Sequence, residues 1–167
     1  AGIIAGRRDL IDRLKRNPMT RAMRPDKLTL AALQAVLQLY TNPERLVEEL
    51  PALRLLMRDP AEIEHLAMRL VIPVQECCQP FDVAVAQTYA QVGSGALPID
   101  RLESTALKIT RPDLRRPGAV LNRLAKAFRG LLVPVIGRIS DDALWFDLRC
   151  LEDEDGFVEN LAGLTAQ

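Results

Sequence analysis

Two arginines three residues apart, Arg21 and Arg24, are the side chains in this sequence best suited to holding an anion. The planar guanidinium of arginine pairs with a phosphate or a carboxylate through two parallel hydrogen bonds. Because a residue before a proline is biased away from helix, Pro25 predicts an extended or turn conformation for Arg24. The alternative, that both arginines are solvated surface charges of no function, stays open on residue types alone.

A long helix is predicted to start directly after these arginines and to position them. Pro25 suits the first turn of a helix, where its missing N–H would have no partner. Apolar side chains then recur at spacings of three, four and three, which is typical of one buried helix face. These side chains belong to Leu30, Leu33, Leu37 and Tyr40.

Composition favours a globular protein and excludes a membrane span. The chain has 167 residues, of which 49% are hydrophobic, and 22 basic side chains balance 22 acidic ones. We see no apolar run of membrane length and no signal peptide, so a soluble, cytoplasmic protein is expected. Residues 7–27 and 101–129 are basic and residues 141–159 are acidic. The basic zones suit a polyanion such as nucleic acid, although ordinary solvated surface explains them as well.

Metal and disulfide chemistry are not predicted. The cysteines are Cys77, Cys78 and Cys150, an odd number with two of them adjacent, which fits neither a disulfide framework nor a zinc site. The single histidine, His65, lies in a helical stretch without a nucleophile pattern nearby, so we interpret it as structural.

The first half of the chain reads mainly as helices. Residues 1–5, AGIIA, form a short apolar run typical of a buried strand. Asp59, Pro60 and Glu62 give the pattern of a helix cap followed by a first-turn proline and an acid. Helices are predicted at residues 7–16, 25–40, 43–50 and 60–78.

After Pro80 the apolar period changes from 3.6 to 2, which predicts strands. Strands are expected at 81–86, around 106–109, at 135–139 and at 144–148, with helices at 120–128 and from 155 onward. This order predicts an α+β layer, an antiparallel sheet of a few strands with helices on one side.

Several motifs together carry a family resemblance. The stretches AGIIAGRRDLI, NPMTRAMRPDKLTLAAL, QVGSGALPIDRL, PVIGRI and DLRCLEDE resemble the bacterial selenocysteine synthases, the L-seryl-tRNA(Sec) selenium transferases. The resemblance runs from Ala1 to about Leu164 and implies the C-terminal portion of a fold-type I pyridoxal-phosphate enzyme. It implies three parts: residues 1–27 end the large cofactor-binding domain, 28–60 are connecting helices, and 61–167 form a small α+β domain.

The resemblance also implies an activity. The family converts seryl-tRNA(Sec) to selenocysteyl-tRNA(Sec) with selenophosphate as donor, through a dehydroalanyl intermediate for which pyridoxal 5′-phosphate serves as electron sink. It further implies a ring-like homo-oligomer in the cytoplasm. By the same resemblance, Arg21 and Arg24 match the arginines that bind the anionic selenium donor.

Two further site predictions follow from the resemblance. Arg149 lies where related enzymes hold a substrate carboxylate, but here it could instead contact the tRNA end, the donor, or an acid such as Asp147 or Glu152. Gly93, Ser94 and Gly95 match a loop that faces the active site, with a plain turn as the alternative.

The lysine that carries the cofactor in this family has no counterpart in this sequence. Lys15, Lys27, Lys108 and Lys126 all lie in other contexts. We therefore expect no catalytic residue here and no activity of this chain alone. Two alternatives stay open: a related pyridoxal-phosphate lyase or transferase that acts on a small amino acid without tRNA, and a non-catalytic domain that binds RNA or a partner through residues 111–129.

Overall fold

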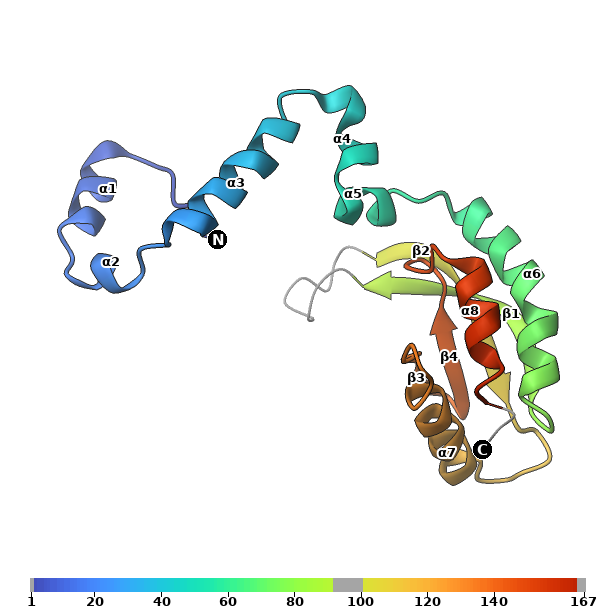
Figure 1. Cartoon of the computed structure of the whole chain (residues 1–167). Helices are drawn as coiled ribbons and strands as arrows, with labels where there is room; N and C mark the ends of the chain where they lie inside the picture. Colours follow the sequence, from blue (N-terminus) through green and yellow to red (C-terminus); the bar gives the residue numbers. More distant parts are fainter. Residues whose placement is uncertain (1, 92–100, 165–167) are drawn as a thin grey trace. The chain divides into compact units, whose positions relative to one another are not determined.

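The computed structural model describes residues 2–91 and 101–164. The chain forms two compact units, Ala1–Arg54 and Leu55–Gln167, which are considered one at a time (Figure 1). The first unit is helical, and its last helix runs into the second unit. Its helices are α1 (Arg8–Lys15), α2 (Met19–Ala22), α3 (Lys27–Leu39), α4 (Pro43–Glu49) and α5 (Pro51–Leu56).

Helix α3 begins two residues later than predicted, because Asp26 and not Pro25 sets its start. The Asp26 carboxylate accepts hydrogen bonds from the Thr29 N–H at 2.9 Å and from the Thr29 hydroxyl at 3.0 Å. This arrangement satisfies an N–H that has no partner within the helix. Pro25 precedes the cap, and Arg24 is non-helical as expected.

The prediction of a buried strand at residues 1–5 is wrong for the described residues 2–5. They have no regular structure, and Ile3 and Ile4 are 69% and 74% exposed. A strand requires a hydrogen-bonded neighbour. The four strands of the described sheet pair with one another, and residues 2–5 are not among them.

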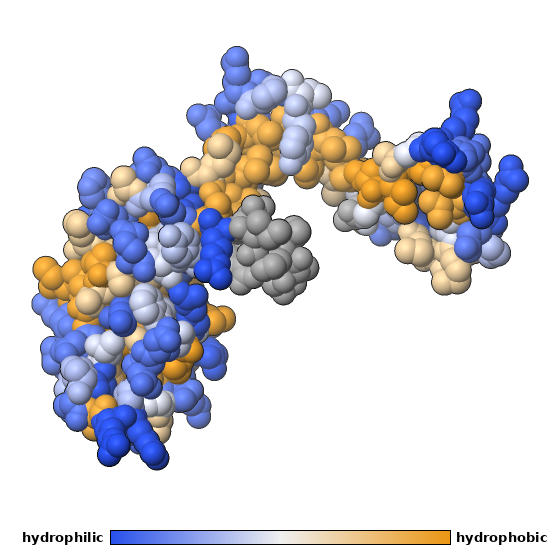
Figure 2. Space-filling view, turned by 180° about the vertical axis from the view of Figure 1, so that it is seen from behind, coloured by the Kyte–Doolittle hydropathy of each residue, from blue (hydrophilic) through white to orange (hydrophobic). Residues whose placement is uncertain are grey.

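The predicted burial of one α3 face is also wrong for this chain. Leu30, Leu37 and Tyr40 are about half exposed, and Leu33 is half-buried. Figure 2 shows apolar surface along the helices of the first unit. The apolar spacing predicted the helix correctly, but none of the described residues in α1–α5 is fully buried, so no core covers this face.

The second unit starts from a long helix, α6 (Pro60–Cys77), that is packed as predicted. The Asp59 carboxylate caps it by accepting from the Ala61 N–H at 2.9 Å. Ile63, Leu66 and Leu70 on its inner face are buried.

A four-stranded antiparallel sheet follows, in the order β1-β2-β4-β3. β3 starts three residues later than expected, since the Val135 N–H bonds to the Phe128 carbonyl at 3.1 Å and not to the sheet. Asp141 and Asp142 form the tight turn between the last two strands, both with positive φ. The strands are β1 (Asp82–Gln91), β2 (Arg101–Thr110), β3 (Arg138–Ser140) and β4 (Ala143–Asp147).

Helices α6, α7 (Gly118–Arg129) and α8 (Glu154–Leu161) share one core with one face of the sheet. On that face Val85, Leu107 and Phe146 lie in register across three strands. The Phe146 ring contacts the Phe128 ring of α7 at 4.6 Å between centroids. The α+β prediction with helices on one side is therefore confirmed. The other sheet face, which carries Lys108, Trp145 and Arg138 in one row, does not face this core.

Candidate functional site

The two arginines singled out by the sequence line one hollow in the first unit. Arg21 on α2 and Arg24 after it share this hollow of about 680 Å³ with Lys15, Thr20 and Pro25. All five residues are exposed. The hollow therefore offers three cations to a single ligand.

Asn17 shapes the turn that brings these cations together. Its side-chain oxygen accepts from the Met19 N–H at 2.9 Å, and its carbonyl accepts from the Thr20 hydroxyl at 2.6 Å. These bonds shape the turn between α1 and the one-turn helix α2, and Lys15 at the end of α1 lines the same hollow as Arg21. Sequence spacing did not reveal Lys15 as a site residue, because Lys15 and Arg21 lie on two different helices joined by a turn, and periodicity relates residues only within one element.

Arg149 has a structural environment that the sequence did not predict. Its side chain is buried, with 4% exposed. Its Nη1 donates to the carbonyl oxygens of Leu55, Leu56 and Arg58 at 3.1–3.2 Å, and its Nη2 donates to the carbonyl of Glu103. The guanidinium thus holds two segments of the second unit, residues 55–58 and Glu103 of β2, and Nε is a buried donor without a partner among the described residues.

Arg58, which sequence reasoning missed, donates in turn to main-chain carbonyls around Arg149. Its Nη1 donates to the carbonyls of Leu148, Arg149 and Leu151 at 3.3, 3.2 and 2.6 Å. Asp147, one of the acids considered as an Arg149 partner, accepts from the Arg149 main-chain N–H at 3.0 Å. Long-range carbonyl contacts of this kind leave no periodic signal in a sequence.

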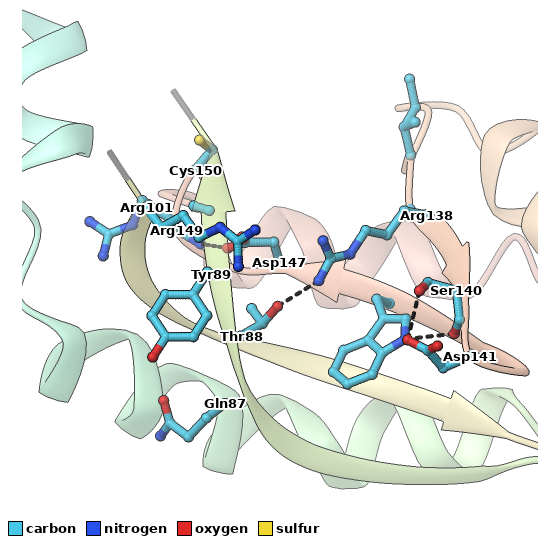
Figure 3. A pocket seen from close by; sticks show the side chains of 14 residues that line it. Gln87, Thr88, Tyr89, Arg101, Arg138, Ser140, Asp141, Asp147, Arg149 and Cys150 are labelled. Atoms are coloured by element: carbon cyan, nitrogen blue, oxygen red, sulfur yellow. Dashed lines mark hydrogen bonds between the residues drawn. The ribbon is translucent and has the colours of Figure 1, made fainter. Parts of the chain in front are cut away.

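A second hollow, of about 1020 Å³, lies on the sheet face away from the helices (Figure 3). Arg138 of β3 crosses this face and donates to the Thr88 hydroxyl of β1 at 2.6 Å. The guanidinium carbon of Arg138 lies 5.7 Å from the centroid of the Trp145 ring, over which Lys108 Nζ also lies, at 5.1 Å. Arg101 and Arg149 line the same hollow.

Other predicted features are placed as follows. Gly93, Ser94 and Gly95 fall outside the described residues. Cys78 is buried in the core, and burial raises the pKa of its thiol to about 12. In the described part of the chain, no helix combines the length and apolar character needed to cross a bilayer.

The fold and the first hollow define an α+β chain with a cluster of cationic side chains that precedes its four-stranded sheet in the sequence. Residues 1–152 match the model of the family described as L-seryl-tRNA selenium transferase. The chain belongs to this family.

Curated relatives are similar over nearly the whole chain. The L-seryl-tRNA(Sec) selenium transferase of Klebsiella pneumoniae (strain 342) is 54% identical over 161 residues, which cover 96% of this chain and 34% of the relative. The protein of the same name from Yersinia pestis (strain Pestoides F) is 50% identical over 163 residues, covering 97% of this chain and 35% of the relative. The chain thus spans about a third of the length of these relatives.

Proposed function

We propose that this chain is part of an enzyme that transfers selenium to the seryl group of seryl-tRNA(Sec), with selenophosphate as the donor. Membership of the L-seryl-tRNA selenium transferase family supports this reaction. The contribution of this chain to that reaction is supported by one observation: Lys15, Arg21 and Arg24 line the same hollow.

In this proposal the cation cluster binds the phosphate of the selenium donor. The two guanidinium groups supply paired donors that match phosphate geometry, and the ammonium of Lys15 adds a third, more flexible charge. Asp26 lies two residues beyond Arg24, but its carboxylate is bonded to Thr29 on α3. These hydrogen bonds lower the pKa of Asp26 and hold its negatively charged carboxylate at the N-terminus of α3.

The described residues fit an anion better than a covalently held cofactor. Pyridoxal phosphate, proposed here from the resemblance, would withdraw electrons from the seryl group when bound. Of the lysines, Lys15, Lys27 and Lys126 are exposed, and Lys108 lies over the Trp145 ring. None is enclosed as an attachment lysine would be, so we place the attachment outside this chain and expect no activity from it alone.

The division into parts and the assembly belong to the same proposal. Residues 1–27 would end a large domain, 28–60 would connect it, and 61–167 would form the small domain. Family membership also underlies the proposals of a ring-like homo-oligomer and of a cytoplasmic location. The alternative role of Arg149 in binding substrate is less well supported than a structural one, because its guanidinium donates to four backbone carbonyls.

The test uses the full-length protein with radiolabelled selenophosphate and seryl-tRNA(Sec). Arg21→Ala and Arg24→Ala should each reduce selenium transfer at least about a hundredfold, the loss typical of removing a positioned charge at a reacting group. Arg13→Ala, an exposed arginine of α1 that does not line the hollow, is the matched control. Full transfer by both hollow variants would remove these arginines from the site.

A further inference from the structure

The open sheet face is concave, and a hydrogen bond between its two edge strands shows this. Thr88 lies on β1 and Arg138 on β3, with β2 and β4 between them. Neighbouring strands lie about 4.8 Å apart, so a flat sheet would separate these edges by about 14 Å. The long Arg138 side chain spans part of this distance, and a curl of the sheet toward this face covers the rest, with small side chains such as Ala84, Ala86 and Ala106 leaving room for the arginine.

The resulting hollow is large enough for a ligand of several polar groups. Its volume of about 1020 Å³ is at the upper end of the range of about 300–1,000 Å³ that is usual for ligand pockets. Two arginines offer charge to this space, Arg101 at the start of β2 and Arg138 on β3, while Arg149 lines it with a guanidinium already bonded to backbone carbonyls (Figure 3). A single inorganic ion would not use this space.

Arg138 is held in position for an anion. Its contact with the Trp145 ring and its bond to Thr88 fix the guanidinium across the hollow. Of its five N–H donors, one is used in the hydrogen bonds of the described residues, so the others can serve a phosphate. Arg101 is exposed at the same hollow and adds a second charge.

Two carboxylates that can accept hydrogen bonds, Asp147 and Asp141, line the same hollow. Asp147 Oδ1 accepts from the Ser104 hydroxyl at 2.6 Å and from the Arg149 N–H at 3.0 Å, which leaves Oδ2 without a partner among the described residues. Asp141, the other acid of the hollow, accepts from the Ser140 hydroxyl through Oδ2. Carboxylates repel phosphate but accept hydrogen bonds from hydroxyl groups. The hollow therefore suits a ligand that carries both phosphates and hydroxyls.

We propose that this concave sheet face binds a single-stranded segment of RNA. Arg138 and Arg101 contact its phosphates, and Asp147 accepts from a ribose 2′-hydroxyl, the group that distinguishes RNA from DNA. This inference rests on the proposed function and deepens it, because it gives the small domain a contact with the tRNA substrate apart from the cation hollow of the first unit.

The test measures binding of the whole 167-residue chain to a fluorescein-labelled twelve-nucleotide RNA and to DNA of the same sequence. Anisotropy titrations at several salt concentrations should show tighter binding to the RNA. Arg138→Gln should weaken RNA binding about tenfold and lower the slope of log K against log salt by about one, as expected for one lost phosphate contact. Arg69→Gln, an exposed arginine of α6 outside the hollow and outside the basic zones of the sequence, should match the unaltered chain.

Asp147→Asn separates specific RNA binding from plain charge attraction. If the carboxylate accepts from a 2′-hydroxyl, this change should reduce the preference for RNA over DNA. An equal gain in affinity for RNA and DNA on Asp147→Asn, or an Arg138→Gln variant that binds like the Arg69→Gln control, would overturn the proposal. Circular dichroism of each variant checks that the fold is kept. Selenium transfer by the full-length protein is a separate readout: if the chain binds RNA no more tightly than DNA while the full-length protein still transfers selenium, this inference fails and the proposed function stands.

Discussion

Arg58 and Arg149 each donate hydrogen bonds to the main chain around the other. Arg149 Nη1 bonds to the Arg58 carbonyl at 3.1 Å, and Arg58 Nη1 bonds to the Arg149 carbonyl at 3.2 Å. The two guanidinium groups together serve carbonyls of the segment before α6 and of the loop after β4. This reciprocal contact fixes the start of the second unit against its sheet.

Removing Arg149 should destabilise the second unit. Arg149→Ala leaves several carbonyl acceptors without a donor, and each buried polar group left unpaired costs about 1–3 kcal/mol. We expect the free energy of unfolding of the chain, measured with urea, to fall by about 2–4 kcal/mol. Arg149→Lys should recover only part of this loss, because one ammonium cannot reach all four carbonyls on the two segments that the guanidinium joins. Arg123→Ala is the exposed control, and a loss for Arg149→Ala no larger than its loss would refute the structural role.

The contact between α7 and the sheet should contribute strongly to stability. Phe128 is fully buried and packs on Phe146. Phe128→Ala should cost about 3–5 kcal/mol in urea unfolding, as large-to-small core substitutions do. Phe128→Leu, which keeps most of the apolar volume, should cost clearly less. A loss below about 0.5 kcal/mol for the alanine variant would mean that the ring is not in a core.

Stability should fall at alkaline pH because of Cys78. Its thiol has a pKa of about 12 in the folded chain, raised by burial from an ordinary value of 9.0. The unfolded chain therefore loses this proton first, so the contribution is complete below pH 9 and declines as pH rises toward 12. Between these values the slope should be about 1.4 kcal/mol per pH unit.

Cys78→Ala isolates this effect from other alkaline titrations. Its urea unfolding should show a smaller decline from pH 8 to pH 10.5 than that of the unaltered chain. Cys150→Ala, at an exposed position, is the control and should decline like the unaltered chain. If all three chains lose stability in parallel, the Cys78 thiol is not the source.

The apolar face of α3 gives a prediction that depends on chain length. Leu37 is 48% exposed and lines a shallow apolar hollow with Leu30 and Leu33. In this chain Leu37→Ala should change the free energy of unfolding by less than about 0.5 kcal/mol. A helix that is apolar on most sides is normally packed in a core. In the full-length protein the same change should therefore cost about 2–5 kcal/mol, and equal small effects in both would place this face in solvent.

Most of the local structure follows from short-range patterns in the sequence, because periodicity and caps act over a few residues. The spacing of Ile63, Leu66 and Leu70 predicted a packed helix, and the Asp59 cap marked its start. Alternating residues predicted strands, and the order of elements predicted an α+β layer. The motifs predicted the family that the comparisons confirmed.

Tertiary structure decided which side chains meet. Lys15 joins Arg21 and Arg24 only through the turn at Asn17, and Arg138 reaches Thr88 only because the sheet curls. Burial was decided in the same way. An apolar period indicates that a face needs a partner, but whether it is covered depends on surfaces far away in the sequence, as the exposed face of α3 shows.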